Sequence, residues 1–310
     1  MGGLALKGRQ RRPDTEVGPV AGPRLHFLSV VTLGFAAVFL AAVIALLLAD
    51  LLYIDLGTLG EVLRSPAIRY AIRLSVITSC TTLGLVVLFA IPVGYALSRY
   101  RFPGHVIADT LVDLPIVLPP LVIGVSLLVF FRTRPSEWVE ALGLQFVSPS
   151  NPVQQILASM DNLVEVLGRQ FVYTVKGIVL CQFLVSASYG IRSAKAAFDS
   201  VDPHLEHLAL TLGCTPTQAF RLVALPLARN GIVAGAIMSW ARAVGVFGPI
   251  MVFAGAVRMK TEVMPTTIFL ELSIGRIEVA LAVALLMLAL AALALIAIRW
   301  LASGERWWGA

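Results

Sequence analysis

Charged residues are scarce in this sequence, and so are cysteines. Only 14% of the 310 residues are Asp, Glu, Lys or Arg, against about 25% in soluble globular domains, which excludes an ordinary soluble domain. The three cysteines, Cys80, Cys181 and Cys214, are far apart and form no C-x-x-C pair. Neither a disulfide framework nor a zinc site is therefore expected, and we interpret them as small apolar side chains that fill space.

Motifs for catalysis and nucleotide binding are also absent. The pattern G-x-x-x-x-G-K-[ST] does not occur and there is no Gly-Lys dipeptide, so a phosphate cradle of that kind has to come from another chain. No H-E-x-x-H or Ser-His-Asp set supports an enzyme. His204 and His207 are three residues apart, but no cysteine lies near them and we expect no metal site. No cofactor is expected in this chain.

Long apolar runs are abundant instead. Hydrophobic residues make up 58% of the chain, and a bilayer core about 30 Å thick is crossed by about 20 apolar residues in a helix. The net charge is +6, but the basic residues flank apolar runs and form no stripe that would bind nucleic acid. We predict an all-α polytopic membrane protein with six spans, at residues 27–52, 70–97, 107–131, 171–190, 230–256 and 277–301.

Six spans place both ends of the chain on one side of the membrane. Residues 1–26 form a basic tail, the spans occupy 27–301, and 302–310 form a short second tail. The first apolar run is too long for a cleavable signal segment and is expected to be an anchored helix. The distribution of Lys and Arg favours both ends in the cytoplasm.

The outer segment, residues 132–170, contains an expected helix. Ser150-Asn151-Pro152 is typical of a helix start. Apolar residues then recur every three or four positions, at Ile156, Met160, Leu163, Val164 and Leu167. This amphipathic helix is expected to pack over the spans, to lie on the membrane surface or to offer a docking face.

The inner segment, residues 191–229, carries two short helices. Asp202-Pro203 starts the first by an N-cap followed by proline, and Gly213 ends it in the left-handed conformation. Thr215 is then the N-cap of the second helix, with Gln218 in position to complete a capping box. The two helices form a compact knob that can contact a cytoplasmic partner.

The knob resembles the EAA loop of the permease subunits of ABC importers. That loop has the pattern E-A-A, three residues, Gly, nine residues, Ile, one residue, Leu-Pro. The resemblance is carried by Gly213, Val223, Leu225 and Pro226, and the E-A-A positions hold His207, Leu208 and Ala209, with Glu206 one place earlier.

Two further runs resemble the molybdate and sulfate/thiosulfate permeases of this family. One is Trp240 to Gly248 with Phe253-Ala254-Gly255, in which Val246 replaces a glutamate of the family pattern. The other extends from Asp113-Leu114-Pro115 through Pro119-Pro120 to Gly124. The resemblance implies a permease subunit in a prokaryotic inner membrane that pairs with a second permease subunit, identical or different. It implies ATPase subunits that bind ATP and Mg on the cytoplasmic side, and an extracytoplasmic substrate-binding protein.

Arg242 is the charged residue that the expected spans place deepest in the bilayer, near its centre. A guanidinium there either lines a path for an anion or pairs with an acid such as Asp109 or Asp113. Gly245 and Gly248 weaken the same span and, with Phe247, are candidates for a path or gate. Gly231 and Gly235 form a small-residue face that favours close helix packing.

The resemblance and Arg242 together predict inward transport of a small oxyanion, such as molybdate, tungstate or sulfate, by alternating access. A permease for a polyamine, ferric ion or thiamine is the alternative within transport. A polytopic membrane enzyme or scaffold is the alternative from another class.

Overall fold

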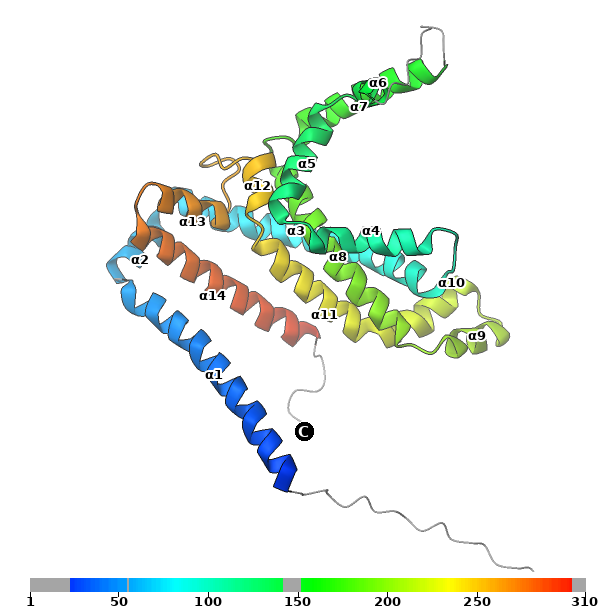
Figure 1. The fold of residues 1–310 in the computed structure, drawn as a ribbon, viewed down its shortest axis with the longest axis horizontal. Coiled ribbons are helices and arrows are strands. Elements are labelled where there is room, and N and C mark those ends of the chain that lie inside the picture. The colour runs from blue at the N-terminus through cyan, green and yellow to red at the C-terminus, as the bar shows by residue number, and fades with distance from the viewer. Residues whose placement is uncertain (1–22, 55, 142–151, 303–310) are drawn as a thin grey trace, which may run out of the picture. The chain divides into compact units, whose positions relative to one another are not determined.

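The computed structural model describes residues 23–54, 56–141 and 152–302, and these residues form helices without any strand. The chain divides into two units, Met1–Tyr53 and Ile54–Ala310. The described part of the first unit is one helix, α1 (Pro23–Tyr53). The second unit holds all the other helices (Figure 1).

The described helices of the second unit follow one another along the chain in the order of their labels. Their bounds are α2 (Leu56–Arg64), α3 (Pro66–Arg99), α4 (His105–Val117), α5 (Pro120–Arg132), α6 (Pro135–Ala141), α7 (Pro152–Phe171), α8 (Val175–Asp199), α9 (Pro203–Thr211), α10 (Pro216–Ala219), the π-helix η1 (Phe220–Ala224), α11 (Leu225–Val244), α12 (Gly248–Phe253), α13 (Met264–Ser273) and α14 (Ile277–Ala302).

Four helices of the described residues are long and apolar enough to cross a membrane. They are Ser29–Tyr53, Pro66–Arg99, Pro216–Val244 and Ile277–Ile296. Two bent pairs bring the number to six if each pair is one span: α4 with α5, bent by 113°, and Gln155–Phe171 of α7 with α8, bent by 101°. The all-α polytopic architecture expected from the sequence is therefore confirmed.

The third expected span, 107–131, is wrong as a continuous helix. It breaks at Leu118 and Pro119, whose ψ angles are 135° and 130°. Each of these residues precedes a proline, whose ring disfavours the helical conformation of the residue before it. The bend between α4 and α5 follows from these two successive prolines.

Other expected boundaries also differ. Helix α8 continues to Asp199, beyond the expected end of the fourth span at residue 190. The fifth expected span, 230–256, ends early, because α11 stops at Val244 with Gly245 as its C-cap. Helix α13 was not expected at all, although Pro265 and Thr266 follow its first residue, and the Thr266 hydroxyl accepts a bond from the Val263 N–H at 2.9 Å.

Helices α3, α8 and α11 pack together as the centre of the second unit (Figure 1). Small residues allow their backbones to approach closely. A Cβ atom at Gly94 of α3 would lie 2.8 Å from the Ala194 Cβ of α8, and one at Gly231 of α11 would lie 2.5 Å from the Ala197 Cβ. The expected close packing of the Gly231 face is confirmed, and its neighbour is α8 of the same chain.

Candidate functional site

The turn after α9 is built by local signals that the sequence carries. The Asp202 carboxylate accepts a bond from the His204 N–H at 2.9 Å and caps the start of the helix. Gly213 takes a φ of +93°, and the N–H of Cys214 reaches the carbonyl of Ala209 at 3.0 Å. This is the Schellman arrangement, which satisfies carbonyls at the helix end and requires the left-handed residue.

Helix α10 begins with the expected capping box. The Thr215 hydroxyl accepts from the Gln218 N–H at 3.3 Å, and the Gln218 side chain accepts from the Thr215 N–H at 2.8 Å. The helix then passes through η1 into α11 without interruption, so Leu225 and Pro226 lie inside a helix. Pro226 has no N–H and so cannot donate a hydrogen bond to a carbonyl of the preceding turn. The chain forms the π-helix η1 in that preceding turn.

The side chains of α9 in the knob are of two kinds, buried and exposed. Glu206 is 7% exposed and points towards α3, and Ala209 is 8% exposed. His207, in the position that the E-A-A pattern gives to glutamate, is exposed. Both carboxylate oxygens of Glu206 are bonded within the chain, to Arg99 and to Tyr95. A direct ion pair between Glu206 and a docked ATPase therefore has no place in this structure.

Several large apolar side chains of the knob are exposed. Leucines with large exposed fractions lie along α9, on the turn after it and on η1. They are Leu205 (42% exposed), Leu208 (58%), Leu212 (86%) and Leu222 (68%). His204 and His207 lie on the same short helix, with ring centroids 6.3 Å apart. Among the described residues, no group of three or more His, Cys, Asp or Glu is placed to hold a metal ion.

Arg242 lies in the last turn of α11, and not at the middle of a longer span as expected. Its side chain is exposed in this chain, and the guanidinium carbon lies 5.9 Å from the centre of the Tyr189 ring. No carboxylate of the described residues forms an ion pair with it. This geometry is that of a cation over an aromatic face, which leaves the positive charge available to an anion.

Of the two expected roles of Arg242, the pairing with Asp109 or Asp113 is wrong, because α8 supplies the partners of both acids. Lys195 donates to Asp109 at 2.7 Å, and Arg192 bonds to Asp113 and also reaches Asp109. These four side chains fasten α4 to the end of α8. No local signal in the sequence predicts this network, since its partners are about eighty positions apart along the chain.

The other candidate path residues surround the break after α11. Gly245 is exposed at the helix end, and the Phe247 ring lies 5.2 Å from the Phe269 ring of α13. A Cβ atom at Gly248 would meet Leu121 of α5 at 3.3 Å. Val246 is only 4% exposed. The segment that follows α11 therefore contacts α5 through Gly248 and α13 through Phe247.

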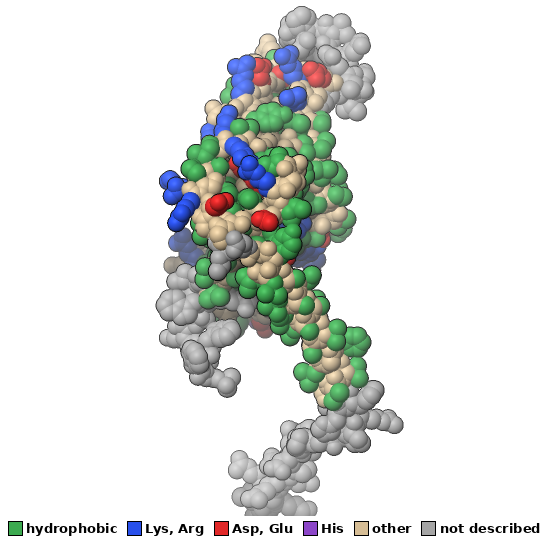
Figure 2. Space-filling model, turned by 90° about the vertical axis from the view of Figure 1, so that its left-hand side faces the viewer, with side chains coloured by type: hydrophobic (Ala, Val, Ile, Leu, Met, Phe, Trp, Pro, Cys, Tyr) green, Lys and Arg blue, Asp and Glu red, His purple; other side chains and the backbone are tan. Residues whose placement is uncertain are grey.

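A second polar group lies between α2 and α13 and was missed by the sequence reasoning. A cavity of about 140 Å³ is lined by Glu61, Arg258, Glu262, Glu271 and Arg276 among others. Arg258 donates to Glu271 at 2.5 Å. Glu262 is 1% exposed, and one of its oxygens has no hydrogen-bond partner in the described part of the chain. Figure 2 looks onto this side of the second unit and shows separate acidic and basic side chains among hydrophobic ones.

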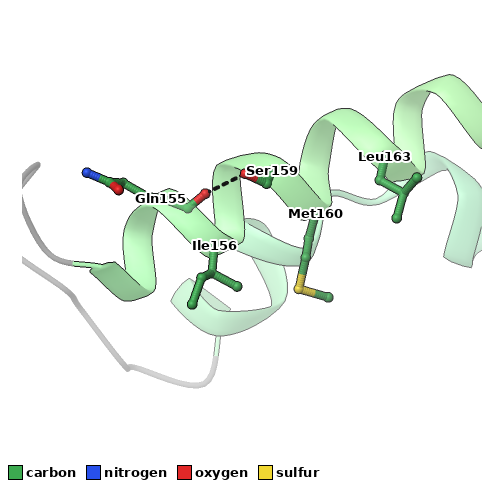
Figure 3. Close-up of a pocket in the computed structure, with 5 residues that line it drawn as sticks. All are labelled: Gln155, Ile156, Ser159, Met160 and Leu163. Atoms are coloured by element: carbon green, nitrogen blue, oxygen red, sulfur yellow. Dashed lines mark hydrogen bonds between the residues drawn. The ribbon is translucent and has the colours of Figure 1, made fainter.

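The amphipathic helix expected after residue 152 is confirmed as α7. Ile156, Met160 and Leu163 project along one side of it and line a shallow hollow of about 480 Å³ with Gln155 and Ser159 (Figure 3). The Asp161 carboxylate accepts a bond from the Ser136 N–H at 3.0 Å, which ties α6 to α7. Which of its three expected roles α7 plays remains a prediction.

Comparison with known proteins places these features in a family. The family described as "Binding-protein-dependent transport system inner membrane component" matches residues 87–307. The molybdate/tungstate transport system permease protein WtpB of Thermococcus kodakarensis is 36% identical over 200 residues, 64% of this chain and 66% of that protein. The match thus spans slightly less than two thirds of that relative.

Other relatives are covered more fully. The molybdenum transport system permease protein ModB of Escherichia coli is 30% identical over 63% of this chain and 77% of its own length. The sulfate transport system permease protein CysT of Salmonella typhimurium is 28% identical over 87% of this chain and 89% of its own. A bacterial ABC transporter that imports alginate shares the fold, with a TM-score of 0.62, 17% identity, and coverage of 92% of this chain and 97% of that one.

Proposed function

Because this chain belongs to the binding-protein-dependent transport system inner membrane components, we propose that it is the permease subunit of an ABC importer for a small oxyanion. It is a multi-pass membrane transport subunit and not an enzyme. Molybdate, tungstate and sulfate are the proposed substrates, transported into the cell across a prokaryotic inner membrane by alternating access. The observation that carries the oxyanion assignment is Arg242, a cation beside the break after α11 that pairs with no carboxylate of the described residues.

The energy for transport comes from ATPase subunits that dock on the knob formed by α9, α10 and η1. The exposed leucines of this knob and His207 offer side chains for docking. The turn at Gly213 sets the geometry between α9 and α10. The sequence has no phosphate-binding loop of the G-x-x-x-x-G-K-[ST] kind, so ATP and Mg bind to the partner. Both chain ends and the knob are cytoplasmic in this proposal.

The opposite end of the second unit faces the extracytoplasmic binding protein in this arrangement. A second permease subunit, identical or different, completes the path, because Arg242 and Gly245 are exposed in the single chain. A guanidinium offers several N–H donors to a tetrahedral oxyanion. A polyamine or ferric ion is disfavoured next to this cation, and thiamine is cationic as well.

Uptake by the reconstituted complex tests the proposal. The chain is co-expressed with its partner permease and ATPase, and uptake of molybdate, tungstate and sulfate is measured in proteoliposomes with the binding protein. Arg242→Ala is expected to assemble with the ATPase and to lose oxyanion uptake, whereas Arg242→Lys is expected to restore little because it lacks the planar fork. Arg229→Ala, on an exposed position of the same helix, is the matched control.

The result that contradicts the oxyanion assignment is full uptake of all three anions by a well-expressed Arg242→Ala complex. Stimulation of ATP hydrolysis by a polyamine, ferric ion or thiamine, and by none of the oxyanions, supports the alternative. Failure of the wild-type chain to retain any ATPase contradicts the proposal as a whole.

A further inference from the structure

We infer that Arg99 and Tyr95 of α3 and Glu206 of α9 form a clasp that transmits movement of the knob to α3. This inference rests on the proposed function, since it concerns how a docked ATPase moves the permease. It assigns positioning roles to three residues, of which only Glu206 was singled out in the sequence. We call these three residues the knob clasp.

In the knob clasp, both carboxylate oxygens of Glu206 accept hydrogen bonds. Arg99 Nε donates to Glu206 Oε1 at 2.7 Å, and Tyr95 Oη donates to Glu206 Oε2, also at 2.7 Å. The Arg99 and Glu206 side chains are only 12% and 9% exposed. Charge-assisted bonds of this length are stronger than neutral ones, and partial burial protects them from screening by water and salt.

Arg99 also fixes the segment that leads into α9. Its Nη2 donates to the carbonyl of Val201 at 2.8 Å. Val201 lies between the end of α8 and the N-cap Asp202 of α9. One guanidinium therefore holds both the entry to α9 and the helix itself against the last turn of α3.

Tyr95 connects the clasp to the second half of the knob through its ring. The ring centroid lies 4.7 Å from that of Phe220, at the start of η1, and 5.2 Å from that of Phe198 in α8. These edge-to-face contacts are a favourable geometry for aromatic pairs. Tyr95 thus contacts the continuation of the knob into α11 while its hydroxyl holds α9.

The knob clasp also matters because of how α9 is bonded to the rest of the chain. Within the described part of the chain, Glu206 takes part in every side-chain hydrogen bond that joins α9 to another helix. The far end of α9 turns through Gly213. A force applied to α9 by a docked partner consequently reaches α3 through Glu206.

A buried ion pair contributes little net stability, because desolvation offsets the attraction, but it fixes geometry. Glu206→Gln keeps the size of the side chain and removes its charge. Arg99→Lys keeps the positive charge and removes the planar guanidinium that donates to Glu206 and Val201. Asp199→Asn is the matched control, since Asp199 accepts a bond from Ser98 of α3 at 2.6 Å and joins the same end of α3 to α8 instead of α9. Each variant is compared with wild type in the complete complex.

Three quantities are measured for each complex: its melting temperature, the amount of ATPase that co-purifies, and molybdate, tungstate or sulfate uptake per ATP hydrolysed. Glu206→Gln and Arg99→Lys are expected to retain the ATPase and to reduce uptake per ATP by about fivefold or more. Asp199→Asn is expected to leave the ratio unchanged. The double variant Arg99→Glu with Glu206→Arg exchanges the two charges and is expected to restore part of the uptake per ATP hydrolysed.

The inference is overturned if Glu206→Gln and Arg99→Lys show the wild-type ratio, whatever their melting temperature. A lower melting temperature with an unchanged ratio would assign the clasp a purely structural role. A wild-type complex that holds no ATPase contradicts the proposed function instead, so the two failures are distinguishable.

Discussion

Gly231 of α11 lies directly against Ala197 of α8, and a Cβ atom at position 231 would come within 2.5 Å of the Ala197 Cβ. The Ser193 hydroxyl of α8 donates to the carbonyl of Gly231 at 2.9 Å. The missing side chain thus allows both close packing and a hydrogen bond between the two helices. Apolar helices in a bilayer depend on such close approach, because lipid is as apolar as their side chains.

Gly231→Val is expected to separate α11 from α8 and to cost about 1–3 kcal/mol, the usual range for overpacking. The measurement is the melting temperature of the purified protein in detergent. Gly84→Ala is the control, since nothing lies within 4 Å of a Cβ atom at that position of α3. Equal melting temperatures for Gly231→Val and wild type would contradict the packing described for these helices.

Gly213 provides a second test, this time of backbone conformation alone. Its φ is +93°, and apart from its chain neighbours no described residue has an atom within 4 Å of a Cβ atom placed there. Gly213→Val is expected to strain the turn by about 1 kcal/mol or more, because a β-branched residue disfavours positive φ. The measurement is the amount of ATPase retained on purification, which should fall while the spans remain inserted.

Gly213→Asn is the matched control, since asparagine tolerates the left-handed region better than other residues with a side chain. It should retain more ATPase than Gly213→Val. If the valine variant couples normally, the glycine serves only as a helix end.

The knob was predictable because its signals are local. Asp202-Pro203, Gly213 and the Thr215–Gln218 capping box each act within a few residues, and the structure has all of them. The proline pair at Pro119 was equally visible in the sequence, but the apolar run around it was interpreted as one span. Hydropathy records that a segment is apolar and says little about where it bends.

The partners of charged residues were not predictable in the same way. A pairing with Asp109 or Asp113 was one of two expected roles for Arg242, but these acids bind Arg192 and Lys195 of α8 instead. Which basic residues bind Asp109 and Asp113 depends on which helix faces α4, and that is determined by how the helices pack in three dimensions. The same holds for Glu206, whose inward orientation follows from the position of α3.

The orientation of the chain in the membrane is tested by thiol labelling in intact cells. With the native cysteines replaced, a cysteine at Thr217 of α10 is expected to resist an impermeant reagent, and one at Ser159 of α7 is expected to react. Both positions are exposed in the structure, so protection reports the membrane and not burial. The reverse pattern would place the knob outside the cell and remove it as an ATPase docking site.

Glu262 lies between α12 and α13, outside the candidate spans, and is 1% exposed. Burial raises the pKa of this carboxyl above its usual value of 4.5, and the negative charge of Glu271 acts in the same direction. A bond from Thr267 and the charge of Arg258 oppose the increase. Burial has the largest effect on this pKa, and one oxygen of the carboxylate has no hydrogen-bond partner among the described residues.

A raised pKa means that the folded protein binds the proton more tightly than the unfolded chain does. The stability from this proton is complete below the unfolded value of 4.5 and is lost as the pH rises through the folded pKa. Glu262→Gln cannot ionise, so it should melt at a higher temperature than wild type at about pH 8, and the advantage should shrink as the pH falls towards about 4.5. Glu278→Gln, at an exposed position of α14, controls for the loss of a surface carboxylate. An advantage of the same size at both pH values would show that the glutamine packs better and that the proton is not responsible.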